Sequence, residues 1–369
     1  MSERLGITYE LSCGRGESPE RKARGIALEQ TVELPAATLP PGIESAMVGR
    51  IETLEPAGGN RFRARISYAP ETVGGELTQL LNVLFGNISL KRGIRITGIA
   101  WPAALLRRLG GPAYGTAGIR RLTGVRERAL LGTALKPIGL DAAALARRCE
   151  AFATGGIDLI KDDHGLADQP SAPFADRLQR CQEAVTRANA RVGGNALYLP
   201  NVTAPFAEFP RRLEAARAAG CRAVLVSPWL AGLDSLRWAR DQFGLALMAH
   251  PALTGSAFGR RHGIAPELVL GDLFRAAGAD ASIYPNADGR FGLSRRRCEA
   301  INGHLRGPLG ELHPAFPVPA GGMDVARAPG WVRRYGIDTI LLIGGSLYAR
   351  GDLVRGAREL LDAVREQHA

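Results

Sequence analysis

A unit of apolar strand, polar loop and amphipathic helix recurs from about residue 128 onward, and this repeat constrains the fold more than any other feature. Eight strands are expected, at residues 129–133, 157–160, 196–199, 223–226, 245–249, 281–283, 315–318 and 339–343. Eight helices alternate with them, at residues 141–153, 174–189, 206–219, 233–242, 265–277, 294–305, 324–335 and 352–366. Eight even units predict an α/β protein with a (β/α)8 barrel. The alternative is an open doubly wound sheet, which usually carries a glycine-rich fingerprint that is missing here.

The first part of the chain has a different pattern of strands and helices. Half-exposed strands and short helices alternate there without a regular repeat, at residues 7–11, 19–30, 61–68, 74–85 and 102–109. This mixture predicts an open α+β domain of ferredoxin-like type. A Gly/Arg-rich connector is expected at residues 110–126. The sequence therefore predicts two domains, residues 1–125 and residues 126–369.

Composition narrows the class of protein. Apolar residues make up 46% of the chain, and no apolar run approaches the roughly 18 residues of a membrane span. No export signal opens the sequence, and its five cysteines are far apart without a CxxC pair. We therefore expect a soluble, cytoplasmic protein with reduced cysteines and no membrane partner.

The net charge of +11 would favour nucleic-acid binding, but the arginines are scattered along helices and aromatic residues make up only 6% of the chain. We expect an anionic substrate and no nucleic-acid partner. Of the 47 basic residues only four are lysine, namely Lys22, Lys91, Lys136 and Lys161. A buried lysine can lose its proton or react covalently, whereas arginine stays charged. Lys136 and Lys161 follow apolar strands, so we expect both to be buried and to take part in chemistry.

Four consecutive ionisable residues end the second expected strand: Lys161, Asp162, Asp163 and His164. In a barrel, the ends of the strands form the active site. The other strand ends in this sequence supply Lys136, Asn201, His250, Tyr284, Gly321, Gly322, Gly344 and Gly345. The glycine pairs can offer backbone N–H groups to a phosphate.

These motifs resemble the RuBisCO large subunit, and more closely the form IV RuBisCO-like proteins, which do not fix CO2. The resemblance rests on the motifs Leu-Gly-Thr-Ala-Leu-Lys-Pro at 131–137 and Gly-Gly-Ile-Asp through Lys-Asp-Asp at 155–163. Gly86-Asn87, Ala320-Gly321-Gly322 and Gly344-Gly345 add to it, and it covers nearly the whole chain.

The resemblance implies a homodimer with shared active sites, a Mg²⁺ ion and a phosphorylated sugar that is enolised. Lys161 would be the carbamylated lysine, Asp163 a metal-ligand acid, Lys136 the proton-transfer lysine and His250 an active-site histidine. Asn87 and Glu29 would be donated by the partner subunit. Gly321, Gly322, Gly344 and Gly345 would bind the phosphate.

Departures from the RuBisCO pattern argue against carboxylation. His164 replaces a metal-ligand acid, so the site could hold Mg²⁺ with water there, hold a softer metal, or use His164 as an acid or base without metal. Ile138 replaces a lysine and Pro251 replaces a phosphate-binding arginine. Tyr284 replaces a histidine of the RuBisCO pattern, and the nearest counterpart of the CO2-polarising lysine is Arg290.

The sequence thus predicts an enzyme that forms an enolate from a phosphorylated keto-sugar, with Lys136 shuttling the proton. Decarboxylation of a 3-oxo-sugar-acid phosphate is slightly favoured. The alternative is an isomerase or enolase acting on a methylthio-sugar phosphate. A second alternative, from another class, is a non-catalytic binding protein that keeps the fold.

Overall fold

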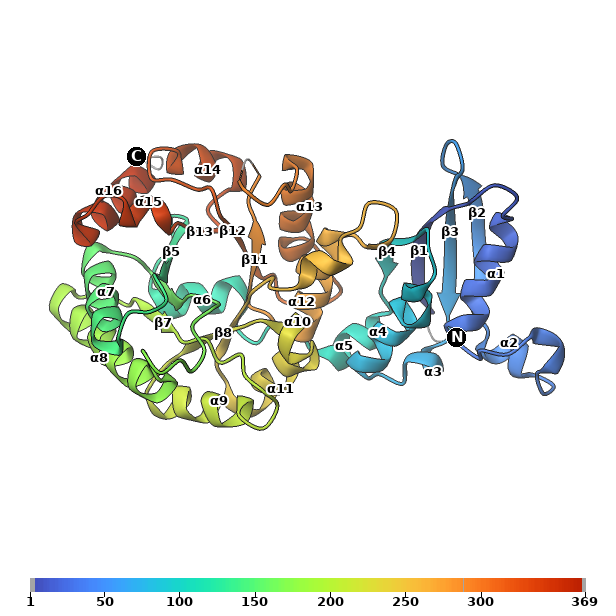
Figure 1. Cartoon of the computed structure of the whole chain (residues 1–369), viewed down its shortest axis with the longest axis horizontal. Coiled ribbons are helices and arrows are strands. Elements are labelled where there is room, and N and C mark those ends of the chain that lie inside the picture. The colour runs from blue at the N-terminus through green and yellow to red at the C-terminus, as the bar shows by residue number, and fades with distance from the viewer. Residues whose placement is uncertain (1–3, 288, 367–369) are drawn as a thin grey trace.

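The computed structural model describes residues 4–287 and 289–366, which form two sheets (Figure 1). The larger sheet has eight strands in the order β7-β6-β5-β13-β12-β11-β9-β8, and its neighbouring strands are parallel. A parallel bridge between Asn201 and Leu225 joins the two outer strands, so the sheet closes on itself. The predicted (β/α)8 barrel is confirmed.

The barrel strands lie close to their expected positions. They are β5 (Leu130–Leu135), β6 (Leu159–Asp162), β7 (Leu197–Leu199), β8 (Ala223–Val226), β9 (Ala246–Ala249), β11 (Ala281–Pro285), β12 (Phe316–Ala320) and β13 (Ile340–Leu342). The second strand starts two residues later than expected and includes Lys161 and Asp162, so both residues lie inside the barrel wall rather than after it.

The helices form a ring around this barrel (Figure 1). They are α7 (Ala142–Gly155), α8 (Phe174–Val192), α9 (Phe209–Ala218), α11 (Asp234–Phe243), α12 (Phe274–Ala277), α13 (Arg295–Arg306), α14 (Ala328–Tyr335) and α16 (Leu353–Arg365), with short α10 (Pro228–Ala231) and α15 (Gly345–Tyr348). The helix expected at 265–277 is instead a π-helix, Leu268–Leu273, followed by α12. In the described part of the chain, no helix is both long and apolar enough to cross a membrane.

The segment expected to be a connector contains a helix, α6 (Gly115–Thr123). Its Ile119 and Leu122 pack into one apolar cluster with inward-facing barrel residues such as Leu130. Buried Asp280 accepts hydrogen bonds from the backbone N–H groups at the start of α6, at 2.7 and 2.8 Å. The helix therefore packs against the barrel core, which short-range sequence patterns did not indicate.

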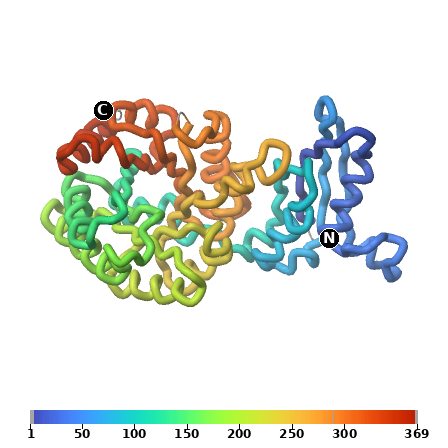
Figure 2. The backbone as a smooth tube through the Cα atoms, in the orientation of Figure 1, coloured from blue at the N-terminus to red at the C-terminus, as the bar shows by residue number. Residues whose placement is uncertain are grey.

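The N-terminal sheet has the order β10-β4-β1-β3-β2 and lies beside the barrel (Figure 1). Its elements are β1 (Leu5–Ser12), α1 (Pro19–Glu29), α2 (Ile43–Met47), β2 (Arg50–Pro56), β3 (Arg61–Tyr68), α3 (Pro70–Val73), α4 (Leu77–Phe85), β4 (Ile94–Ala100), α5 (Ala103–Leu109) and β10 (Gly263–Ile264). Strand β10 belongs to the loop after β9, which crosses from the barrel to the N-terminal sheet (Figure 2). The expected α+β domain is confirmed, while its boundary at residue 125 stays a prediction.

A buried carboxylate joins the two parts of the chain. Trp101, which follows β4, donates its indole N–H to Asp272 on the π-helix at 3.2 Å. The other oxygen of Asp272 lies 2.7 Å from Nδ1 of His304 on α13. This contact raises the pKa of the His304 imidazole, so the folded protein holds a proton that the unfolded chain releases more easily.

The stability of the protein should depend on pH through His304. The His304–Asp272 contribution is fully present below the ordinary histidine pKa of about 6.5, where both states carry the proton, and it is lost as the pH rises through the raised folded-state value. The difference in unfolding midpoint between wild type and His304→Gln should therefore shrink from pH 6 to pH 9. Exposed His313→Gln is the control. A difference that grows with pH would contradict this assignment.

Candidate active site

Lys161 lies at the centre of the site. Strand β6 is buried along its whole length, and Lys161 is only 3% exposed. Its Nζ donates a hydrogen bond to the carbonyl of Asp162 at 2.9 Å. Burial lowers the pKa of Lys161 to about 8, with the nearby charge of Lys136 adding to the effect. The neutral, nucleophilic form of this amine is therefore more populated near neutral pH than that of an ordinary lysine, although the ammonium still predominates at pH 7.

Lys136 and Asp163 face each other because of the strand register. Leu135 of β5 pairs with Asp162 of β6, so the next residue on each strand lies opposite the other. The Lys136 ammonium contacts the Asp163 carboxylate, which also accepts the N–H of Gly165 at 3.1 Å. Burial opposes ionisation of Asp163, but these contacts lower its pKa. The Lys136 side chain is 43% exposed, so the burial expected for it is absent.

The two expected histidines stack on each other across the site. The rings of His164 and His250 have centroids 4.3 Å apart and an interplanar angle of 12°. Nδ1 of His164 lies 3.3 Å from Asp163. Burial, followed by the charge of Lys161, holds the pKa of His250 well below its usual value. His250 Nδ1 accepts the backbone N–H of Ala252 at 3.1 Å, so the proton of the neutral ring is on Nε2.

A buried cluster of hydrogen-bonded side chains lies behind β6 and supports this arrangement. We call it the platform; it consists of Asp162, Arg177, Tyr198 and Asn201, and the sequence did not reveal it. The Asp162 carboxylate accepts hydrogen bonds from Arg177 Nε at 3.1 Å, from the Tyr198 hydroxyl at 2.8 Å and from the backbone of Asn201 at 3.0 Å. The Asn201 side chain, expected at the barrel mouth, is buried and donates to the His164 carbonyl at 3.1 Å. The sequence does contain one indication that Arg177 is buried, because this charged residue lies on the apolar face of α8.

Tyr284 is not in the site, which corrects the sequence-based expectation. Its hydroxyl donates to Asn302 on α13 at 2.7 Å, so the side chain points outward from the barrel. Side chains alternate along a strand, and the inward neighbour here is Ile283, which packs in the barrel interior. An apolar residue thus takes the inward position at the end of β11.

The two glycine pairs differ in their surroundings. A Cβ placed on Gly344 would lie 3.9 Å from Lys136 Cε, and one placed on Gly345 would meet nothing within 4 Å. Gly321 and Gly322 both have positive φ, and a Cβ on Gly321 would lie 3.7 Å from the ring of Phe291. The Gly344–Gly345 turn is therefore open and beside a cation, whereas an aromatic ring lies against Gly321.

Asn87 and Glu29 come together in the N-terminal domain. Asn87 Nδ2 donates to Glu29 at 3.3 Å, and Lys91 pairs with the same carboxylate at 2.7 Å. The Lys91 hydrogen bond is the main reason that the pKa of Glu29 is lowered. No described contact connects either residue to the barrel mouth of its own chain. Their expected role in a partner's site stays a prediction.

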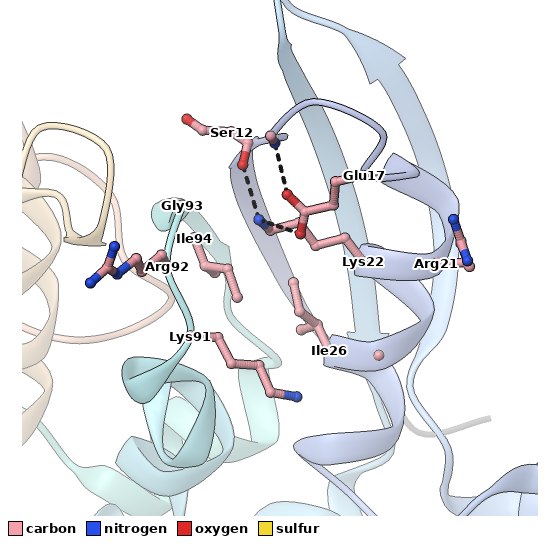
Figure 3. Close-up of a pocket in the computed structure, with 11 residues that line it drawn as sticks. Ser12, Glu17, Arg21, Lys22, Ile26, Lys91, Arg92, Gly93 and Ile94 are labelled. Atoms are coloured by element: carbon pink, nitrogen blue, oxygen red, sulfur yellow. Dashed lines mark hydrogen bonds and ion pairs between the residues drawn. The ribbon is translucent and has the colours of Figure 1, made fainter.

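A groove of about 490 Å³ also lies in this domain, between α1 and the start of β4 (Figure 3). It contains Lys22, but the Lys22 ammonium is bound to the Ser12 carbonyl and to Glu17, at 2.9 and 3.0 Å. Arg21 and Arg92 point away from each other at its edges (Figure 3). Two of the four lysines, Lys22 and Lys91, are thus engaged in ion pairs outside the barrel.

The side chains around Lys161 include few groups that can bind a metal ion. Among the described residues, no group of three or more His, Cys, Asp and Glu side chains could hold a metal. Asp163 and His164 supply one carboxylate and one imidazole, and the partly neutral amine of Lys161 lies beside them. A carbamate on that amine would complete a set of three, so these residues fit a divalent cation only with the lysine modified.

Comparisons with known proteins give the family. The catalytic-domain model of the ribulose bisphosphate carboxylase large chain matches residues 115–289. The sequence is 41% identical over 354 residues, 95% of each protein, to ribulose bisphosphate carboxylase-like protein 1 of Rhodopseudomonas palustris. The chain belongs to the RuBisCO-like proteins. The resemblance seen in its motifs is confirmed.

Two further known proteins are similar to this RuBisCO-like protein along nearly its whole length. The crystal structure of a Rubisco-like protein from Rhodopseudomonas palustris is 40% identical and has a TM-score of 0.91 over 99% of each chain. The 5-methylthioribulose-1-phosphate isomerase of Rhodospirillum rubrum is 40% identical over 355 residues, which is 95% of this chain and 93% of that protein.

Breaking the buried platform should unfold the protein more easily. Arg177 and Asp162 are fully buried, so Arg177→Met leaves the buried carboxylate without its cationic partner and should lower the free energy of unfolding by about 3–5 kcal/mol. Chemical denaturation measures this change. Arg180→Met on the same helix removes an exposed ion pair with Asp176 and should leave stability unchanged. Equal stability of Arg177→Met and wild type would show that the platform is not needed.

Proposed function

We propose that this RuBisCO-like protein is an enolase-type isomerase that acts on a methylthio-sugar phosphate such as 5-methylthioribulose 1-phosphate. The observation that carries the proposal is the cluster of the buried Lys161, the Lys136–Asp163 pair and the neutral His250 at one barrel mouth. These groups can move a proton between carbons beside a ketone. The substrate class comes from the similarity to the isomerase of Rhodospirillum rubrum.

The substrate phosphate would bind at the open turn of Gly344 and Gly345, beside Lys136. Pro251 and Ile138 stand where the RuBisCO pattern has cations, which favours a substrate with a single phosphate. The ketone would then lie between Lys161 and the histidine pair.

Each residue has a distinct part in the proposed proton transfer. In its neutral form, Lys136 removes the proton from the carbon beside the ketone, and the ammonium that results, positioned by Asp163, returns a proton to another carbon. His250, neutral with its proton on Nε2, donates a hydrogen bond to the oxygen that becomes negative in the enolate. The stacked ring of His164 limits the movement of His250.

A divalent cation, proposed as Mg²⁺, would be held by carbamylated Lys161, Asp163 and His164. When bound, it would supply positive charge that stabilises the enolate oxygen. Assembly into dimers, with Asn87 and Glu29 reaching the partner's barrel, is part of the same proposal.

Decarboxylation of a 3-oxo-sugar-acid phosphate, which the sequence slightly favoured, is the weaker alternative. It would begin from the same enolate-forming site, but the 40% identical relative named for its reaction is an isomerase.

Loss of either barrel lysine should abolish proton transfer. Wild type should incorporate solvent deuterium into 5-methylthioribulose 1-phosphate and form an isomer, followed by NMR in D2O. Lys136→Met should lower kcat about 10²–10⁴-fold, the usual contribution of a general acid–base group. Lys161→Arg should also be inactive, because guanidinium stays charged and does not form a carbamate.

Lys22→Met, which removes a lysine outside the barrel, should keep its activity. If wild type exchanges no deuterium with any phosphorylated keto-sugar, the protein is a non-catalytic binder. If it releases CO2 from a 3-oxo-sugar-acid phosphate without isomerising the methylthio-sugar, the decarboxylase alternative holds.

A further inference from the structure

Phe291 is an exposed aromatic residue beside the candidate site. It lies on the loop between β11 and α13, and 59% of its surface is exposed. One edge of the ring lies against Gly321, at the end of β12. The guanidinium of Arg290 lies 4.8 Å from the ring centroid. Because Gly321 directly follows β12, the ring lies at the barrel mouth.

A second exposed apolar side chain lies at the end of another barrel strand, β5. Ile138, on the loop after β5, is 50% exposed. Its Cδ1 would be 2.6 Å from a Cβ on Gly165, so the isoleucine lies directly over the backbone next to Asp163. Single exposed apolar side chains are common on protein surfaces, so it is the position of these two at the barrel mouth that bears on ligand binding.

Phe291 lies in a different sector of the mouth from Lys136 and the open Gly344–Gly345 turn. Lys136 and the open Gly344–Gly345 turn follow β5 and β13, which are neighbouring strands. Phe291 and Gly321 follow β11 and β12, where the inward residue is Ile283. A ligand with one anionic end and one apolar end could bind the open glycine turn with its anionic end and contact Phe291 with its apolar end.

We propose that Phe291 is a specificity-determining residue that binds the apolar, sulfur-containing end of the substrate, while the phosphate binds at Gly344 and Gly345. The inference rests on the proposed function and adds to it the means of telling a methylthio group from a hydroxyl. Thioether sulfur makes favourable contacts with the edges of aromatic rings, whereas a hydroxyl loses hydrogen bonds to water there. The aromatic ring thus favours a thioether over the hydroxyl of an ordinary pentulose phosphate.

Two substrates that differ only at this end test the inference. For Phe291→Ala, the ratio of kcat/KM for 5-methylthioribulose 1-phosphate to that for ribulose 1-phosphate should fall about tenfold, the low end for a small apolar group in a pocket. Phe291→Leu should restore part of the ratio, because it keeps apolar surface and loses the ring. Phe206→Ala is the matched control, since Phe206 is 94% exposed on the loop after β7; it should leave the ratio unchanged.

Binding measurements separate this inference from the proposed reaction. Calorimetry with 5-methylthioribitol 1-phosphate and ribitol 1-phosphate, which lack the ketone, requires no turnover. A tenfold loss of preference in Phe291→Ala supports the inference even if the isomerase proposal fails. An unchanged preference overturns it even if wild type is an isomerase. Equal losses for both compounds, or a changed oligomeric state in light scattering, would mean that Phe291 orders the loop or contacts a second subunit, and would also overturn it.

Discussion

The burial of the Lys161 amine inside the barrel wall is the interaction on which the rest of the site depends. Strand β6 is covered on both faces, so a cation there is costly, and burial shifts the lysine toward its neutral form. The only hydrogen bond described for the amine is to the neighbouring Asp162 carbonyl. A chemically reactive group is therefore produced by the fold itself rather than by an adjacent base.

Two layers of contacts support the surroundings of Lys161. Next to the amine, Asp163 is held between Lys136 and the N–H of Gly165. Behind the strand, Arg177 and Asn201 tie Asp162 to the loop that carries His164. A site that must hold several polar groups within short distances benefits from such support, since small displacements cost catalytic rate.

The two domains are connected by more than a linker. The loop after β9 begins at His250 and ends in β10, which adds a parallel strand to the N-terminal sheet. His262 in this loop contacts the carbonyl of Ser89, two residues after Asn87. The loop that begins at His250 therefore also contacts the segment that follows Asn87 in the N-terminal domain.

The sequence by itself determined the barrel, the eight strands to within about two residues, and the identity of Lys136, Lys161, Asp163, His164 and His250 as neighbours. It could do so because strand periodicity is local and all strand ends of a parallel barrel meet at one mouth. Only the tertiary structure decided which side of a strand faces the site, which excluded Tyr284 in favour of Ile283. It also decided the burial of Lys161, the exposure of Lys136, the Asp162–Arg177 platform and the place of Phe291. These properties depend on contacts between residues far apart in the chain, which no local pattern encodes.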